Sequence, residues 1–273
     1  MTRRFNMMEM VGSAMVLSLF AVAILAPHLA PFDPTRAVAS TFGDPGAPSS
    51  AFILGTDELG RDVLSRIIWG ARISLTVGVA AMAITMSIGV TIGLASGFFS
   101  GVTDFVLMRF TDVMLTLPAL LLAMAFVAVL HPSLLNVLLV IGLVSWTQIA
   151  RVVRAETLSM VQRDFVMAAR ALGGSPPRLI ARHVLPNVMP IIVVMAVLGT
   201  SSTLLLDAGL SFLSLGVPPP TPSWGRMIEE ALIYFRTAPW LIAFPGLAIF
   251  YAVLGFNLLG YGYLRARAGR AAG

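Results

Sequence analysis

The chain contains no lysine, because all 18 of its basic residues are arginine, and it contains no cysteine. A phosphate-binding P-loop needs a lysine on the nucleotide phosphates, and Schiff-base catalysis needs a lysine amine. The chain therefore performs neither function alone. Without cysteine it also has no disulfide bonds, no thiol nucleophile and no thiolate metal ligands.

Charge of either sign is scarce as well. Only 11% of the 273 residues are charged and 58% are hydrophobic, whereas soluble domains are about 25% charged. A soluble fold cannot bury this much apolar surface, so the composition indicates an integral membrane protein. The net charge of +5 could suggest a nucleic-acid partner. The arginines, however, lie between apolar runs, where such residues set the orientation in the membrane.

Six apolar runs are each long enough, or nearly so, to cross a bilayer, which takes about 20 residues. They cover residues 10–30, 73–97, 104–130, 134–150, 188–206 and 240–261. The first run resembles a signal peptide, but its apolar core is too long and it lacks a small-x-small cleavage site. We therefore expect a retained helix and an all-α integral membrane fold with six transmembrane helices.

This pattern divides the chain into four parts. An N-terminal transmembrane helix (1–31) is followed by an outer loop with an interfacial segment (32–72). A core with five transmembrane helices (73–264) contains a basic insert (151–187), and a short tail (265–273) ends the chain. Six spans place both termini on one side, which carries twelve arginines against six on the other. The positive-inside rule then predicts an N-in, C-in orientation with a cytoplasmic insert and tail.

The insert includes the stretch MAARALGGSPPRLIARHVLPN, residues 167–187. Good helix formers precede Gly173 and Gly174, which predict the end of a helix, since glycine adopts the conformation needed after the last turn. Ser175 can cap a second helix, and Pro176 fits its first turn, where no amide donor is needed. The pattern predicts two short helices joined by a sharp glycine turn.

Pro186 follows the second of these helices, and we expect it to break or kink the chain at the entry to the fifth span. Two interpretations of the insert remain at this point. It is either an ordinary basic loop lying on lipid, or a docking element for an acidic partner. A loop that only sets orientation does not need a capped pair of helices, which favours the second interpretation.

Three ionisable residues lie inside or near the apolar runs. Asp207 follows three leucines at the outer end of the fifth span, and such a residue suggests a pathway or gate role. An interfacial position in water is the alternative. Arg109 and Asp112 are three residues apart on one helix face and can form a structural ion pair.

Nothing in the sequence indicates a catalytic or metal site. The three histidines are too far apart for metal-ligand spacing; they are His28, His131 and His183. A membrane enzyme would need a convergent nucleophile, base or metal, and none is present. A self-contained secondary transporter remains an alternative, although it would need intramembrane acids and leaves the insert unexplained.

Four segments together resemble the permeases of the dipeptide/oligopeptide/nickel family of ABC importers. Residues 54–75 (LGTDELGRDVLSRIIWGARISL) resemble the family's segment before the second helix, and residues 167–187 resemble its EAA loop. Residues 208–225 (AGLSFLSLGVPPPTPSWG) resemble its fifth-helix exit, and residues 256–269 (FNLLGYGYLRARAG) its C-terminal signature. The match is to the C-type member of each permease pair. The chain departs from the family at Met167, His183 and Tyr261.

The resemblance implies a type I ABC importer permease fold in the bacterial cytoplasmic (inner) membrane. The ATPase-coupling residues would be Ala168, Ala169, Gly173, Gly174, Leu185 and Pro186. The outer structural signature would be Asp57, Gly60, Arg61 and Asp62. Implied partners are a second homologous permease forming a heterodimer, two cytosolic ATPase subunits or domains, and an extracytoplasmic substrate-binding protein.

By the same resemblance, ATP and Mg²⁺ bind to the ATPase subunits, so this chain holds no cofactor or metal and is not itself an enzyme. Di- and oligopeptides are the expected substrates. Nickel, glutathione or another small solute remain alternatives, because a separate binding protein delivers the ligand.

Overall fold

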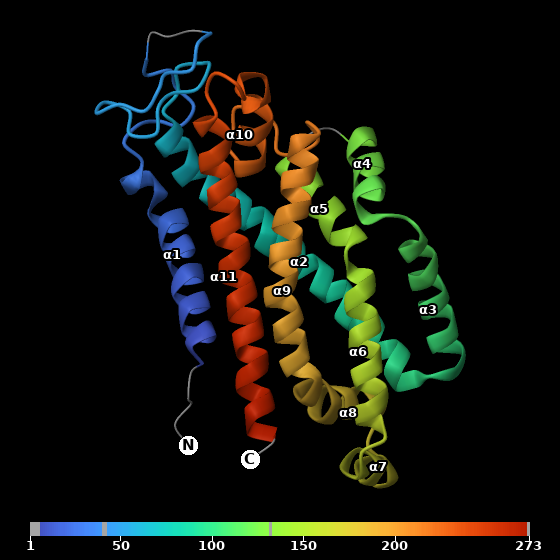
Figure 1. Cartoon of the computed structure of the whole chain (residues 1–273). Coiled ribbons are helices and arrows are strands. Elements are labelled where there is room, and N and C mark those ends of the chain that lie inside the picture. Colours follow the sequence, from blue (N-terminus) through green and yellow to red (C-terminus); the bar gives the residue numbers. More distant parts are fainter. Residues whose placement is uncertain (1–5, 40–42, 131–132, 272–273) are drawn as a thin grey trace.

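The computed structural model describes residues 6–39, 43–130 and 133–271, and it is a bundle of long helices (Figure 1). Five helical runs are long and apolar enough to cross a membrane, and a pair of helices bent by 84° makes six if the pair is counted as one span. This confirms the predicted all-α fold. α1 (Met7–Leu29) begins, and α11 (Trp240–Ala271) ends, at the same end of the bundle (Figure 1).

α2 (Val63–Phe99) runs obliquely through the bundle, behind α9 in Figure 1, and is the longest single helix with 37 residues. Its start corrects the prediction that the second span begins at residue 73. The ten earlier residues include Arg66 and Arg72 and follow Asp62, which is why they were assigned to a polar loop. In the structure Arg66 pairs with carboxylates of neighbouring segments and Arg72 lies exposed against the Trp69 ring, so the helix extends through both.

A stripe of glycines lets α2 approach α6 (Trp146–Val161) closely. Gly89, Gly93 and Gly97 recur every fourth residue and therefore lie on one face. A Cβ atom at Gly93 would lie 2.7 Å from both the Ala150 carbonyl oxygen and the Val153 Cβ. Small residues at this spacing are the usual means of close helix packing in membranes.

The third and fourth spans are both interrupted. α3 (Gly101–Thr116) and α4 (Ala119–Val129) meet at an angle of 84° beside Pro118. In the next span, Ser145 separates α5 (Leu134–Val144) from α6. The fourth span reaches Val161 instead of ending at residue 150, because Arg151 and Arg154 of α6 pair with aspartates on α3.

The ends of the bundle carry the shorter helices. α10 (Trp224–Ala231), followed by the 3₁₀ turn η2 (Leu232–Tyr234), packs at the end opposite the termini, beside the long loop before α2 (Figure 1). At the other end lie α7 (Asp164–Ala171) and α8 (Pro176–Leu179). The basic helices and both termini therefore share one end, as predicted, while the sidedness in the membrane stays a prediction.

Of the two predicted effects of Pro186, a break or a kink, the break does not occur. α8 continues through a π-helical turn, η1 (Ile180–Val184), directly into α9 (Leu185–Phe212). A proline inside an α-helix removes one amide donor and clashes with the preceding turn. The wider π-helical turn just before Pro186 absorbs this misfit, so the helix continues without a gap.

Candidate translocation pathway and coupling loop

A cavity of about 590 Å³ lies between α2, α4, α6 and α9, at the level of the two interrupted spans. Leu117 and Pro118, between α3 and α4, form part of its wall, and so does Ser145 between α5 and α6. α9 contributes Gly199 and Ser202. Irregular backbone at membrane depth is tolerated where it lines a polar cavity or is buried in protein, and both interruptions meet this condition.

The cavity lining is neutral. Its polar side chains are hydroxyl and amide groups, and its other side chains are mostly apolar. The polar members are Thr85, Ser145, Thr147, Gln148, Ser202 and Thr203. Within the described residues, no charged side chain lines the cavity. Neutral donors and acceptors of this kind suit a solute that is held through its own hydrogen-bonding groups.

Asp207, which we predicted as a possible pathway or gate residue, lies on α9 and is only 1% exposed. It is not among the residues that line the cavity. Its Oδ1 atom has no hydrogen-bond partner in the described part of the protein, and neither has the hydroxyl of Ser211, one turn further along α9. Asp207 therefore lies within the helix packing, and its role in the pathway stays a prediction.

The chain from α7 to α8 forms the predicted helix, glycine turn and second helix. Gly173 has a φ of +83°, in the left-handed region that glycine occupies without strain. Its amide donates to the Arg170 carbonyl at 3.0 Å, and the Gly174 amide donates to the Ala169 carbonyl at 3.1 Å. These two bonds form a Schellman motif that ends α7. Ser175 precedes α8, but its side chain makes no capping hydrogen bond.

α7 has one exposed face and one buried face. Met167, Ala168 and Leu172 are exposed, with 89% of Leu172 accessible. Val166 is fully buried, and Ala169 is half-buried against the same apolar cluster. We predicted that both alanines would form a docking surface. In the structure Ala168 faces outward, whereas Ala169 packs toward the protein's own interior.

The apolar cluster beneath α7 connects the two short helices to the membrane spans. Leu179 of α8 and Val184 of η1 are buried in it, together with residues of α2, α6 and α9. Leu185 packs at its edge and Pro186 is exposed. The ring of His183, one departure from the family pattern, lies 6.4 Å from the ring of Phe165 on α7. The two short helices and the start of α9 thus share one core.

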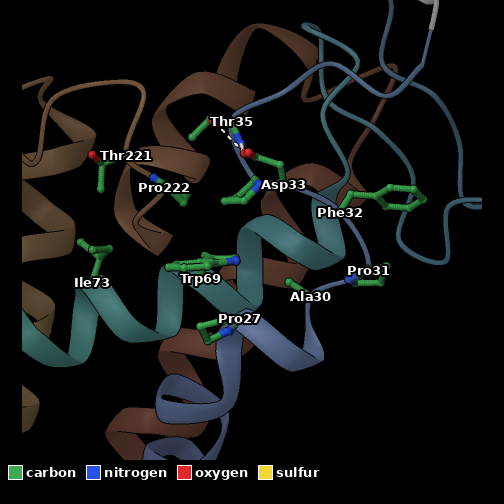
Figure 2. Close-up of a pocket in the computed structure, with 11 residues that line it drawn as sticks. Pro27, Ala30, Pro31, Phe32, Asp33, Thr35, Trp69, Ile73, Thr221 and Pro222 are labelled. Atoms are coloured by element: carbon green, nitrogen blue, oxygen red, sulfur yellow. Dashed lines mark hydrogen bonds between the residues drawn. The ribbon is translucent and has the colours of Figure 1, made fainter.

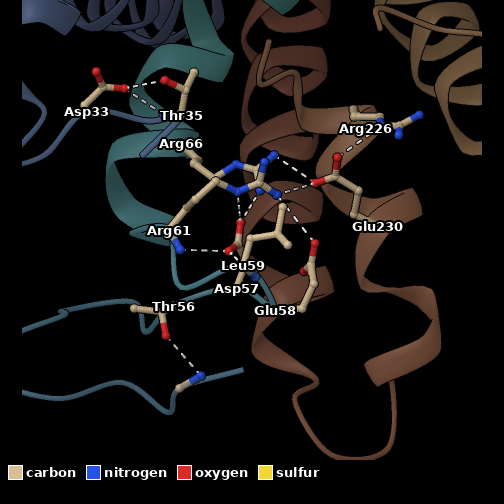
Figure 3. A network of polar contacts seen from close by, with 11 residues as sticks. Asp33, Thr35, Thr56, Asp57, Glu58, Leu59, Arg61, Arg66, Arg226 and Glu230 are labelled. Atoms are coloured by element: carbon tan, nitrogen blue, oxygen red, sulfur yellow. Dashed lines mark hydrogen bonds and ion pairs between the residues drawn. The ribbon is translucent and has the colours of Figure 1, made fainter. Parts of the chain in front are cut away.

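At the opposite end, the signature loop before α2 folds around Asp57 (Figure 3). The Asp57 carboxylate accepts hydrogen bonds from the backbone amides of Leu59 at 3.0 Å and Arg61 at 2.8 Å. Gly60, at the turn between them, has a φ of +71°. The aspartate therefore organises its own loop and is 5% exposed.

Two arginines share the carboxylates of Asp57 and Glu230 (Figure 3). Arg61 Nε lies 2.7 Å from Asp57 Oδ2, and its Nη2 lies 3.2 Å from Glu230 Oε2. Arg66 Nη2 lies 2.8 Å from Glu230 Oε2, and Arg66 also contacts Asp57. Arg226 on α10 completes the group, 3.1 Å from Glu230 Oε1. We call these five residues the outer clamp.

The outer clamp joins the loop and the start of α2 to α10. Arg66, Arg226 and Glu230 were not among the predicted site residues. Glu230 is 164 positions from Arg66 in the chain, so no local spacing indicates that they meet. In the sequence, the one indication of this contact was that the start of α2 and α10 both contain charged residues. Asp57 and Arg61, which belong to the predicted structural signature, lie together.

Asp62 serves a different purpose from its neighbours. It is the N-cap of α2, and its carboxylate accepts hydrogen bonds from the Ser65 amide at 2.8 Å and the Ser65 hydroxyl at 2.7 Å. Ser65 Oγ in turn accepts a hydrogen bond from the Phe32 amide at 3.0 Å. The cap therefore also holds the segment that leaves α1 against the start of α2.

Glu58 lies at the edge of the outer clamp, 3.5 Å from Arg61. Burial raises the pKa of Glu58 above its ordinary value of 4.5, and the nearby carboxylates of Asp57 and Glu230 raise the pKa further. A backbone hydrogen bond and the Arg61 charge oppose this rise in the pKa. Glu58 thus binds a proton more readily in the folded protein than in an unfolded chain.

A second cavity of about 590 Å³ lies where α1 leaves the bundle (Figure 2). Trp69 on α2, Pro27 on α1 and Pro222 from the loop before α10 face it from three segments. Asp33 and Thr35, at its rim, are hydrogen bonded through the Thr35 hydroxyl at 2.6 Å. The lining is mainly apolar, and in the described chain its one ionisable member is Asp33.

The predicted pair of Arg109 and Asp112 does not form. Asp112 instead accepts a hydrogen bond at 2.5 Å from Arg151 on α6, while the Arg109 guanidinium lies 5.3 Å from the centre of the Phe105 ring. A partner on a neighbouring helix competes with one on the same helix, and α6 packs beside α3. The aspartate therefore connects two helices instead of stabilising one.

The described histidines, His28 and His183, lie at opposite ends of the bundle, in α1 and η1; His131 lies outside the described residues. Among the described residues, no group of three or more histidine, aspartate or glutamate side chains could hold a metal ion. The expectation that the chain binds no metal or cofactor stays a prediction.

Five or six apolar spans, a neutral cavity beside two helix interruptions and a pair of short helices at one end are the features of a membrane permease. The family model for the inner membrane component of binding-protein-dependent transport systems matches residues 89–270. The chain therefore belongs to this family of ABC importer permeases of the bacterial inner membrane. The family comprises membrane permease subunits, which work with other subunits of the importer.

Individual relatives cover nearly the whole chain. The di/tripeptide transport system permease protein DppC of Pseudomonas aeruginosa is 42% identical, over 92% of this chain and 84% of its own length. The dipeptide transport system permease protein DppC of Haemophilus influenzae is 39% identical, over 94% and 88%. The glutathione transport system permease protein GsiD of Pectobacterium atrosepticum is 41% identical, over 90% and 82%.

Proposed function

We propose that this chain forms half of the pathway of an ATP-driven importer for di- and oligopeptides. The neutral cavity at the interrupted spans is the observation that carries the proposal. Peptide backbones offer amide donors and carbonyl acceptors, which match its hydroxyl and amide lining. Similarity to relatives named for dipeptide and di/tripeptide transport supports the same substrate class.

The alternative substrates, nickel and glutathione, fit the cavity unequally. A nickel ion prefers imidazole, thiolate or carboxylate ligands, and within the described residues the cavity lining offers none of them. Glutathione is itself a tripeptide, and the similarity to glutathione permeases keeps it as the second candidate. A self-contained secondary transporter would not depend on ATP, which the experiment below also tests.

The coupling step is assigned to the exposed face of α7. A cytosolic ATPase pair would receive Met167, Ala168 and Leu172 in a groove, while Ala169 and the apolar cluster transmit the movement to α2, α6 and α9. A second permease would complete the cavity wall, and a substrate-binding protein would deliver the peptide at the opposite end. ATP and Mg²⁺ belong to the ATPase subunits, which would alternate the permease pair between two rigid-body states.

The test uses the importer assembled with its natural ATPase, second permease and binding protein in proteoliposomes. Dipeptide uptake should require ATP and should exceed glutathione uptake. Ala168→Glu should reduce uptake to background without lowering the thermal stability of the complex, because the side chain projects from the surface. Ala168→Ser is the matched control and should retain uptake. ATP-independent uptake, or full uptake by Ala168→Glu, would contradict the proposal.

A further inference from the structure

Two arginines on the first turns of α2 have opposite surroundings. Arg66 is 2% exposed and contacts two carboxylates of the outer clamp. Arg72 is exposed, and within the described chain no carboxylate lies within ion-pair distance of it. Its guanidinium instead lies 5.6 Å from the centre of the Trp69 ring. The charge of Arg66 is therefore neutralised within the protein, whereas the charge of Arg72 is free to bind an external anion.

Arg72 lies near one boundary of the membrane. It is nine residues into α2, about 14 Å from the start of the helix at 1.5 Å per residue. On the neighbouring α1, Ile24 lines the same groove and lies between one and two turns before the helix ends at Leu29. A long arginine side chain this close to the end of a span can extend to the lipid phosphates, and tryptophan side chains prefer the same boundary.

An apolar groove of about 450 Å³ extends from Arg72 between α1 and α2. Phe20, Ile24 and Val79 form its sides, and the small side chains of Ala23 and Ala83 leave room between the helices. From Arg72 to Ala83 the groove follows α2 for about 16 Å. This length matches much of an acyl chain, and the groove begins at a cation.

We propose that Arg72 and this groove bind an anionic phospholipid such as phosphatidylglycerol. The guanidinium would pair with the phosphodiester, as arginine does with phosphate oxygens in bidentate geometry, and one acyl chain would occupy the groove. Trp69 orients the guanidinium from its ring face. In a zwitterionic lipid such as phosphatidylcholine, the ammonium group of the head group already neutralises the phosphate. The unpaired Arg72 should therefore bind an anionic lipid in preference to a zwitterionic one. This site is independent of the proposed substrate.

The test uses the assembled importer in nanodiscs that contain a small fraction of lipid brominated near the glycerol end of its chains. Bromine quenches nearby tryptophan fluorescence, and the difference between wild type and Trp69→Phe isolates the signal of Trp69. Brominated phosphatidylglycerol should occupy the site about fivefold more than brominated phosphatidylcholine, the preference typical of one basic residue at an anionic surface.

Arg72→Gln should abolish this preference, whereas Arg72→Lys should preserve most of it. Arg236→Gln is the matched control, since Arg236 is also exposed near the outer end and has no ion pair among the described residues. Equal quenching by the two lipids in wild type, or a preference that survives Arg72→Gln, overturns the proposal. Loss of the second permease from the Arg72→Gln complex would also overturn it, because the arginine would then contact that subunit.

Discussion

At the scale of single residues, the outer clamp is the largest concentration of buried charge in the described chain. The side chains of its members are 2–19% exposed, so water screens their charges only weakly. Three guanidinium groups surround the single carboxylate of Glu230. Removing one partner of such a group leaves buried charges uncompensated, which costs more than the pairing itself contributes.

Glu230→Gln should therefore lower the free energy of unfolding by roughly 3–5 kcal/mol, the usual cost of breaking a buried ion pair. Thermal unfolding of the purified protein in detergent measures this change. Arg36→Gln removes the exposed contact of Arg36 with Asp33, 3.5 Å long, and should leave the melting temperature unchanged. Equal melting temperatures for the two variants would show that the clamp does not stabilise the fold.

Glu58, beside the outer clamp, should make the free energy of unfolding depend on pH. Because its folded-state pKa is raised above 4.5, the folded protein binds more protons than the unfolded chain between 4.5 and that raised pKa. The free energy of unfolding should therefore fall as pH rises through this window. Glu58→Gln should flatten the dependence, and melting temperatures recorded on both sides of pH 4.5 test it. An unchanged slope in the variant would assign the effect to another group.

At the scale of helices, the sequence could predict the number of elements better than their ends. The glycine turn after α7 follows from two adjacent glycines, and it forms as expected. The start of α2 and the end of α6 were both predicted too close to the membrane centre. A hydropathy profile assigns arginine and aspartate to loops. In the structure these helices contain such residues because they form ion pairs with neighbouring helices, as Arg151 of α6 does with Asp112 of α3. Such pairing depends on neighbouring helices and is absent from local sequence.

The glycine stripe of α2 was also missed, although its spacing is visible in the sequence. Gly93→Leu should separate α2 from α6, since even a Cβ atom at this position would lie 2.7 Å from α6. We expect a loss of stability of a few kcal/mol, as in other overpacked sites, measured by thermal unfolding.

Gly246→Ala on α11 is the matched control, because nothing lies within 4 Å of a Cβ atom there. This substitution should be neutral or slightly stabilising, since alanine favours a helix over glycine. A Gly93→Leu protein as stable as the control would mean that α2 and α6 do not pack as closely as described.

At the scale of the whole molecule, the cavity draws on four spans and both interrupted helices. Its position could not be predicted from the sequence, because Pro118 and Ser145 define it only once the helices are packed. Asp207 illustrates the same limit. Its place near the end of an apolar run suggested a pathway residue, and the structure locates it in the packing between helices.

Ser202→Trp should obstruct the cavity, because Ser202 is exposed on its wall and a large indole would occupy its volume. Peptide uptake by the assembled importer should fall to background, while co-purification with the ATPase subunits persists. Leu247→Trp, exposed on α11 and not in the cavity lining, is the control and should transport normally. Normal uptake by Ser202→Trp would place the pathway elsewhere.

The uninterrupted helix from Pro176 to Phe212 has a mechanical consequence. Its 37 residues span about 55 Å, more than the hydrocarbon core of a bilayer. A displacement of the α7–α8 turn would therefore reach the far end of α9, which packs against α10, along one continuous helix. The one compliant section is the π-helical turn at residues 180–184. If its register shifted by one residue, everything beyond it would rotate by about 100°, which makes this turn the natural swivel of the molecule.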